Sequence, residues 1–211
     1  GFCLVGSEMC IRDRMKVVVT DLRLHSDGNA RCGWCGGDED YVAYHDDEWG
    51  IRATSDDEWY EKVCLEGFQS GLSWITILRR RDAFREVFAN FDPDVVATFT
   101  DSDVERLVLD ERIIRHRGKI SSTINNAKRA LELRAEFGSL DAFFTNYVEP
   151  DEHRPHALGD VPAQTDTSRA LAKELRRRGW TFVGPTTMYA MAQSMGLVND
   201  HLIGCWRRDR C

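Results

Sequence analysis

The chain has 211 residues, of which 42% are hydrophobic and 30% are charged, and its formal net charge is −7. This composition is typical of a globular protein with one domain or two small ones. The stretch from Phe182 to Asn199 has no charged residue, but it contains Pro185 and several polar side chains, which make it too polar for a bilayer span. The aromatic fraction of 10% excludes wholesale disorder. We therefore expect a globular, non-membrane protein.

The seven cysteines are an odd number, and no secretory signal opens the chain. This pattern favours a cytoplasmic protein with free thiols or metal ligands over a disulfide scaffold. Residues 1–14 show neither helical nor strand periodicity, and Glu8 to Arg14 reads like one frame of a sequencing-library transposon end. We expect residues 1–14 to be non-native and residues 1–30 to form a leader that is partly disordered.

The first helical signals lie between residues 55 and 109. A capping box from Ser55 to Glu58 predicts a helix over 56–70, and a broad apolar stripe marks 73–91 as helical. Asp92 followed by Pro93 predicts a new helix start. A second capping box, Ser102 to Glu105, predicts a short helix that ends near Leu109.

The second half of the chain is also predicted to be helical. The pattern predicts helices over 119–137, 140–148, 168–178 and 185–196, the first of them closed by Gly138. Residues 149–166 contain three of the five prolines and are expected to form a long loop. Only Lys16 to Thr20 resembles a strand. We therefore predict an all-α fold.

Cysteine and histidine residues gather near the two ends of the chain. His201 and Cys205 lie one helical turn apart, and Cys32 and His45 can supply two further ligands of a tetrahedral zinc site. Four protein ligands make a zinc site structural, because a catalytic zinc keeps a position open for water. Ordinary buried thiols and histidines are the alternative interpretation.

Cys32 and Cys35 also form a C-x-x-C motif, which suggests a thiol oxidoreductase. The motif normally follows a strand within a parallel sheet, and this sequence predicts no such sheet. Cys35 remains a second possible metal ligand on spacing alone.

Seven of the eleven tryptophan and tyrosine residues fall within 41 positions, from Trp34 to Trp74. Most of them are expected to be core residues, but aromatic rings beside a carboxylate can also hold a planar cationic base. Glu66 is such a carboxylate, inside the apolar segment from Val63 to Phe68. A helical wheel places Glu66 at the flank of the apolar face, which predicts a partly exposed side chain.

The segment from Arg112 to Arg129 contains six basic residues and no acid, while ten acids and one arginine lie between Asp38 and Glu61. Within this basic segment a short turn joins two predicted helices. Such a helix-hairpin-helix can bind a DNA phosphate through backbone amides at the start of the second helix. A solvated helix surface and an ordinary interhelical turn are the alternatives.

Several motifs resemble the bacterial 3-methyladenine DNA glycosylase I (Tag) family. The resemblance extends in order from about Arg31 to Cys205. The motifs are Arg31-Cys-Gly-Trp34, Tyr44-His-Asp-Asp-Glu-Trp-Gly50, Cys64-Leu-Glu-Gly67, Gly71-Leu-Ser-Trp-Ile75, Ile113-Ile-Arg-His-Arg-Gly-Lys119, Phe182-Val-Gly184 and Gly196-Leu-Val-Asn-Asp-His201.

The resemblance implies a helix-hairpin-helix domain over 56–164 and a zinc-stapled domain built from 31–55 and 165–211. It implies base recognition by Glu66 and one structural zinc ion. The resemblance also implies Tyr44 and Trp74 as the stacking pair, Trp34, Tyr41 and Trp49 as nearby aromatics, and Cys32, His45, His201 and Cys205 as zinc ligands. The helix-hairpin-helix interpretation of the basic segment assigns the DNA contacts to Arg115, Arg117, Gly118 and Lys119. Glu111 and Arg112 stand where the hairpin is expected to have small residues.

The implied activity is hydrolysis of the N-glycosidic bond of 3-methyladenine in double-stranded DNA by a monomeric enzyme, which releases the free base and leaves an abasic site. No general base is assigned, and neither Lys119 nor Lys128 is expected to act as a Schiff-base nucleophile. The alternatives are a non-catalytic zinc-stapled DNA-binding module and the thiol oxidoreductase.

Overall fold

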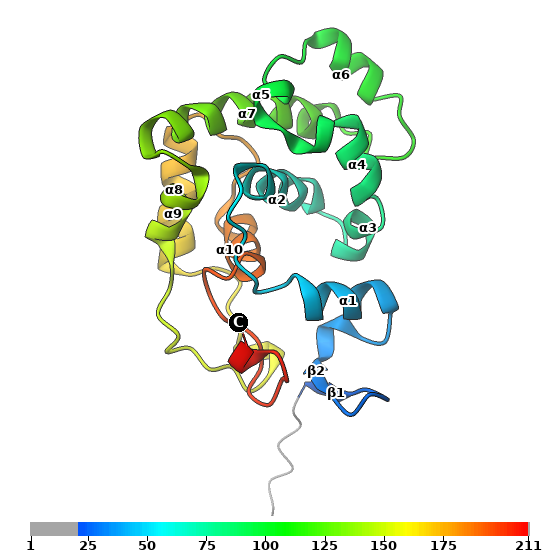
Figure 1. Cartoon of the computed structure of the whole chain (residues 1–211), viewed down its shortest axis with the longest axis vertical. Helices are drawn as coiled ribbons and strands as arrows, with labels where there is room; N and C mark the ends of the chain where they lie inside the picture. Colours follow the sequence, from blue (N-terminus) through cyan, green and yellow to red (C-terminus); the bar gives the residue numbers. More distant parts are fainter. Residues whose placement is uncertain (1–20, 211) are drawn as a thin grey trace, which may run out of the picture.

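The computed structural model describes residues 21–210 and is built almost entirely of helices, with one two-stranded antiparallel hairpin (Figure 1). The all-α prediction is therefore confirmed apart from the hairpin, which the sequence patterns did not predict. The elements are β1 (Leu22–Leu24), β2 (Ala30–Cys32), α1 (Glu39–Asp47), α2 (Asp56–Gln69), α3 (Trp74–Leu78), α4 (Arg81–Val87), α5 (Pro93–Val96), α6 (Asp101–Leu107), α7 (Arg117–Phe137), α8 (Leu140–Phe144), α9 (Asp166–Arg177) and α10 (Pro185–Ser194), with short 3-10 turns between them.

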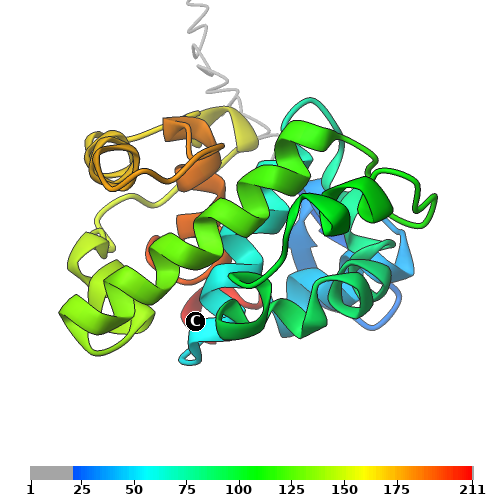
Figure 2. The same ribbon diagram turned by 90° about the horizontal axis from the view of Figure 1, so that it is seen from above.

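Helix α2 is the centre of the fold. Its capping box forms as predicted, with the Ser55 amide donating to Glu58 and the Glu58 amide donating to the Ser55 hydroxyl. Ten consecutive residues, Trp59 to Phe68, are buried, since α2 packs against α3, α5, α7, α8 and α10. The long helix α7 crosses over α2 (Figure 2) and ends at Gly138 as predicted. A helix covered in this way has no face in contact with solvent, so an amphipathic pattern cannot indicate which of its side chains are exposed.

The predicted helical stretch over 73–91 is broken into two helices, α3 and α4. The chain turns between them at Arg79 and Arg80, and it leaves α4 through Ala89, Asn90 and Phe91, all with φ between +51° and +56°. Left-handed backbone ends a helix and is unfavourable for residues other than glycine. The apolar stripe is nevertheless buried as predicted, with Phe84 and Phe88 fully covered.

The short helix α6 also starts earlier than predicted. Its capping residue is Thr100, whose amide and hydroxyl both donate to Asp103, rather than Ser102 with Glu105. The prediction at Asp92 is confirmed, because its carboxylate accepts from the amides of Asp94 and Val95 at the start of α5.

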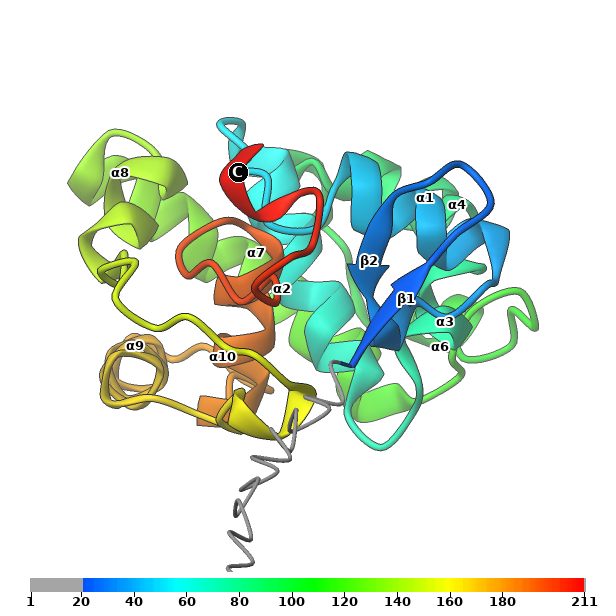
Figure 3. The same cartoon turned by 90° about the horizontal axis from the view of Figure 1, so that it is seen from below.

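The two ends of the described chain lie against each other. The β1–β2 hairpin and the segment after α10 lie on the same face (Figure 3), where the Trp206 amide donates to the Ala30 carbonyl at 2.9 Å. The hairpin begins inside the range that was expected to be leader, at Leu22. The predicted strand at Lys16 to Thr20 and the expected non-native residues 1–14 lie outside the described residues. Within the described chain, no helix has the length and hydropathy of a membrane span.

Gly196 allows the loop after α1 to pass close to the end of α10. Its φ is +66°, and a Cβ atom there would lie 2.7 Å from the Gly50 carbonyl oxygen. Gly138 has a similar φ of +88°, but a Cβ atom there would have no neighbour within 4 Å, so this position provides a matched control.

We expect Gly138→Ala to lower the free energy of unfolding by about 1–2 kcal/mol through backbone strain alone. Gly196→Ala is expected to cost roughly twice as much, because the backbone clash adds to the same strain. Urea unfolding measures both, and equal losses would show that the approach of Gly50 does not constrain this position.

Candidate active site and metal centre

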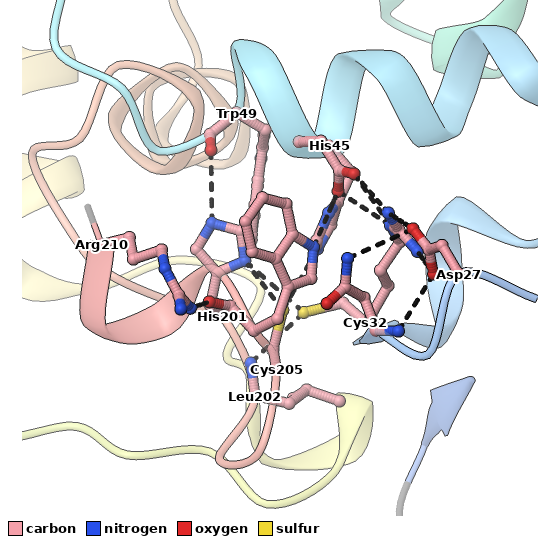
Figure 4. Close-up of polar contacts among 12 residues, drawn as sticks. Asp27, Cys32, His45, Trp49, His201, Leu202, Cys205 and Arg210 are labelled. Carbon is pink, nitrogen blue, oxygen red and sulfur yellow. Dashed lines mark hydrogen bonds and ion pairs between the residues drawn. The ribbon is translucent and has the colours of Figure 1, made fainter. Parts of the chain in front are cut away.

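Four buried side chains from the two ends of the chain meet beneath α1. Cys32 ends β2, His45 lies on α1, and His201 and Cys205 follow α10 (Figure 4). Their ligand atoms all lie within 4.8 Å of one another. Sγ of Cys205 lies 3.4 Å from Nε2 of His45 and 3.5 Å from Nδ1 of His201, which itself lies 3.7 Å from Sγ of Cys32. This cluster of four, which the spacing predicted, could hold a metal ion.

Neighbouring groups orient the two imidazole rings. Nδ1 of His45 lies 2.8 Å from the Asp46 carboxylate, which leaves Nε2 facing the cluster. Nε2 of His201 lies 3.2 Å from the Trp49 carbonyl oxygen, which leaves Nδ1 facing the cluster (Figure 4). Histidine metal ligands are commonly held in this way through their second nitrogen.

The two thiols of the cluster shift each other's pKa in opposite directions. The Cys32 thiol and then the two imidazoles lower the pKa of Cys205, whereas Cys205 and burial raise the pKa of Cys32. A lowered pKa favours the Cys205 thiolate, which is the metal-binding form of cysteine.

Cys35 lies outside the cluster and is fully buried. Burial raises its pKa to about 11, so the thiol remains protonated near neutral pH. A redox-active C-x-x-C needs a thiolate of low pKa. The burial of Cys35 and its raised pKa therefore do not support the thiol oxidoreductase alternative.

A cavity of about 290 Å³ lies between α1, α2, α3 and the C-terminal segment, with the Glu66 side chain in its wall. Glu66 is only 5% exposed, so the wheel-based expectation of a partly exposed side chain is wrong. The residues that line the cavity are Trp34, Tyr41, Tyr44, Trp49, Glu66, Gln69, Trp74, Leu158, Val161, Ala190, Gln193 and Asp200. All six of the predicted pocket residues are among them.

The predicted stacking pair lies side by side in this wall. The ring centroids of Tyr44 and Trp74 are 5.3 Å apart at an interplanar angle of 43°. A base held between two parallel rings needs about 7 Å between them, from two contacts of about 3.5 Å. In this arrangement a base stacks on one ring, or the rings separate to admit it.

The other aromatic side chains support this wall. Trp34 packs edge-on against Tyr41 at 5.7 Å and against Trp49 at 5.1 Å, measured between ring centroids. The Tyr41 hydroxyl accepts a hydrogen bond from the Ile75 amide, which ties α1 to α3.

Sequence reasoning missed a charged residue in the cavity wall, Asp200, and a second one, Lys62, that contacts wall residues without lining the cavity itself. Asp200 is buried in its wall, and one carboxylate oxygen accepts from Tyr189 and Gln193 while the other has no hydrogen-bond partner among the described residues. Lys62 lies one turn before Glu66 on α2, with its Nζ atom 3.3 Å from the Glu66 carboxylate. Burial raises the pKa of Glu66, and the ammonium group of Lys62 opposes that shift. A lysine four residues before a central glutamate is an i, i+4 pair that the sequence itself displays.

The predicted DNA contacts fall at the start of α7. Arg115 and Arg117 are more than half exposed, although they pair with Glu111 and Glu105. Gly118 lies in the first turn of α7, where a Cβ atom would come within 3.2 Å of the His116 ring. This ring accepts a hydrogen bond from the Lys119 amide and caps the helix.

Lys119 does not face the surface. Its side chain is buried, and its ammonium group donates to the carbonyls of Phe68 and Ser70 at 2.8 and 2.7 Å. These carbonyls end α2, so the Lys119 side chain joins α7 to the helix that carries Glu66. This placement argues against the expected phosphate contact by the Lys119 ammonium group.

A family model described as methyladenine glycosylase matches residues 34–208. DNA-3-methyladenine glycosylase 1 of Escherichia coli is 46% identical over 177 residues, which cover 83% of this chain and 95% of that protein. The chain belongs to the methyladenine glycosylase family.

Solved structures of family members have the same fold. A crystal structure of 3-methyladenine DNA glycosylase I is 44% identical with a TM-score of 0.81, covering 83% of this chain and 98% of the other. A structure of the Staphylococcus aureus enzyme, described as the basis of its 3-methyladenine recognition, is 33% identical with a TM-score of 0.80, covering 84% and 96%. The resemblance seen in the motifs is therefore confirmed.

The two basic residues Lys119 and Arg115 are expected to act differently when they are replaced. Lys119→Met leaves two carbonyls at the end of α2 without their donor and is expected to lower the free energy of unfolding by about 2–3 kcal/mol. Arg115→Ala, at an exposed ion pair, is expected to change it by less than about 0.5 kcal/mol but to weaken binding to duplex DNA. Urea unfolding and DNA titration test this, and a loss of DNA affinity in folded Lys119→Met equal to that of Arg115→Ala would contradict it.

Proposed function

We propose that this protein is a DNA repair glycosylase that hydrolyses the N-glycosidic bond of 3-methyladenine in alkylated double-stranded DNA, releasing the free base and leaving an abasic site. The observation that carries the proposal is the burial of the Glu66 carboxylate in an aromatic-lined cavity. Membership of the methyladenine glycosylase family supports it.

The chemistry of the lesion suits this cavity. Methylation at N3 places a positive charge on the purine, so the base departs as a neutral molecule and needs little help from a general acid. Aromatic faces attract cations, and a carboxylate in a medium of low dielectric attracts them strongly. The Glu66 carboxylate can also accept a hydrogen bond from the exocyclic amine. In this proposal Glu66 recognises the base, Tyr44 and Trp74 stack on it, and Trp34, Tyr41 and Trp49 complete the aromatic surroundings.

The nucleotide must leave the helix to reach the cavity, which costs least for a damaged, weakly paired base. The start of α7 is proposed to hold the DNA during this step, since helix amides and the helix dipole favour a phosphate. Gly118 supplies close backbone approach there, and Arg115 and Arg117 supply exposed positive charge. Contacts of this kind position the duplex without reading its sequence.

A structural zinc ion is proposed for the cluster of Cys32, His45, His201 and Cys205. Tetrahedral zinc with about 2.3 Å to sulfur and about 2.0–2.1 Å to nitrogen places neighbouring S and N ligands about 3.5 Å apart. The three S to N distances of 3.4, 3.5 and 3.7 Å fit this geometry. When bound, the ion would join the two chain ends. We further propose residues 56–164 as the helix-hairpin-helix domain and residues 31–55 with 165–211 as the zinc-stapled domain.

Incubation of the purified protein with methylated duplex DNA, followed by chromatography of the released bases, tests the activity. We expect release of 3-methyladenine and no strand cleavage. Glu66→Gln is expected to weaken binding of free 3-methyladenine about tenfold or more, since it replaces the charged acceptor of the hydrogen bond from the exocyclic amine, while binding to undamaged DNA changes little. Glu61→Gln is the control, because it also removes a buried carboxylate from α2, the one that pairs with Arg85 of α4. DNA binding without base release would favour the non-catalytic module.

Metal removal and cysteine substitution test the cluster. Elemental analysis is expected to find one zinc ion per chain. Because metal binding contributes folding free energy, Cys205→Ala is expected to lose the ion and to lower the melting temperature sharply. Cys35→Ser, a buried cysteine outside the cluster, is expected to retain the ion. Retention of zinc by Cys205→Ala would refute the assigned ligand set.

A further inference from the structure

Lys62 places a buried positive charge directly beside the base-recognition carboxylate. Lys62 is 9% exposed, and its ammonium group contacts three side chains of the cavity wall. Nζ lies 3.3 Å from the Glu66 carboxylate, donates to the Tyr44 hydroxyl at 2.5 Å, and lies 3.9 Å from the centroid of the Trp74 ring. These neighbours are the same three side chains that the proposed function assigns to the base.

The position of the ammonium group is the type of position that a cationic ligand takes. A cation over a tryptophan face within about 6 Å is attracted by the ring, and a carboxylate at hydrogen-bond distance adds to that attraction. Lys62 satisfies both interactions internally, so the Glu66 carboxylate already has a cationic partner in the absence of a base. A purine that carries its own positive charge then meets a nearly neutral pair rather than an unopposed negative charge.

We propose that Lys62 is a specificity-determining residue of the base pocket, whose ammonium group acts as an internal counter-ion of Glu66 and weakens the preference of the pocket for cationic over neutral purines. This inference rests on the proposed role of Glu66 in base recognition. The protonated lysine repels a cationic base, and the neutral amine does not. Affinity for a cationic base is therefore expected to rise with pH as Lys62 loses its proton, while affinity for a neutral base changes little.

The pKa of Lys62 depends on a balance between its burial and the charges of its neighbours. Burial lowers the pKa of Lys62, and the Glu66 carboxylate opposes that shift. Glu48, directly after α1, also opposes it, but Glu48 is paired with Arg81 of α4, whose charge lowers the pKa of Lys62.

The remaining neighbouring charges offset each other, since Glu61 of α2 is paired with Arg85 of α4. Tyr44, on α1, is kept protonated by burial, which raises the pKa of its phenol well above the usual value. Glu66 is thus the main opposing charge that faces the ammonium group.

A double-mutant cycle separates the two charges. The proteins are the wild type, Lys62→Met, Glu66→Gln and the double variant, with Lys62→Gln as a polar substitute should Lys62→Met fail to fold. Two probes differ in charge: 3,9-dimethyladeninium is a fixed cation at every pH, and 9-methyladenine is neutral. Calorimetric titration gives the ratio of their affinities between about pH 6 and pH 10.

Lys62→Met is expected to raise the affinity ratio of the cation to the neutral probe by about tenfold near neutral pH, since it removes a positive charge a few ångströms from the ligand. On the Glu66→Gln background, where Glu66 cannot titrate, affinity for the cation is expected to rise with pH. The double variant is expected to show no such rise.

Two failures are distinguishable in this cycle. If Glu66→Gln leaves the affinity ratio of the two probes unchanged, the proposed role of Glu66 is wrong and the inference about Lys62 falls with it. If Glu66→Gln lowers the ratio but Lys62→Met and Lys62→Gln leave it within threefold of the wild type, or the pH dependence persists in the double variant, the inference about Lys62 alone is overturned.

Discussion

The buried carboxylate of Glu66 is the constraint on which the rest of this structure depends. A carboxylate in the middle of a helix that is covered on every side is unfavourable unless neighbouring groups stabilise its charge. Lys62 stabilises it from the same helix, and Lys119 fixes the carbonyls at the end of that helix from α7. One contact within α2 and one from α7 thus fix the position of α2, and with it the position of the Glu66 carboxylate in the cavity wall.

The metal-ligand cluster and the cavity share segments of the chain. Trp34 follows Cys32 by two residues, Tyr44 directly precedes His45, and Asp200 directly precedes His201. Each of these three cavity residues is therefore positioned by a ligand of the cluster. In addition, the Trp49 carbonyl accepts from the His201 ring, so a fourth cavity residue is also tied to a member of the cluster. Under the proposed function, this arrangement lets the cluster contribute to base binding indirectly, since it holds the walls of the pocket together.

Local signals in the sequence predicted much of the fold. Ser55 with Glu58, Asp92 with Pro93, and Gly138 marked helix ends correctly, because capping depends on a few adjacent residues. The break after α4 gave no such signal, since its left-handed residues are alanine, asparagine and phenylalanine rather than glycine.

The site was predictable to a different degree for each residue. The four cluster residues could be found from spacing and residue type, which carry metal chemistry directly. The burial of Glu66 could not, because a helical wheel assumes one solvent face and α2 has none. For the same reason Lys119 was expected to contact DNA and Lys62 was not singled out, whereas tertiary packing turns both toward buried partners.

The charges in the pocket bear on selection and on rate in different ways. An interaction that is equally strong before and in the transition state improves binding without lowering the barrier. When the bond to the sugar breaks, positive charge leaves the purine and moves toward the sugar, so a carboxylate beside the base stabilises the starting cation more than the departing neutral base. Under the proposed function, Glu66 therefore contributes to selection of the damaged base and opposes its departure. A neighbouring ammonium group such as Lys62 has the opposite effect on both selection and departure. It weakens binding of the cationic base and favours the loss of positive charge from the purine when the bond breaks.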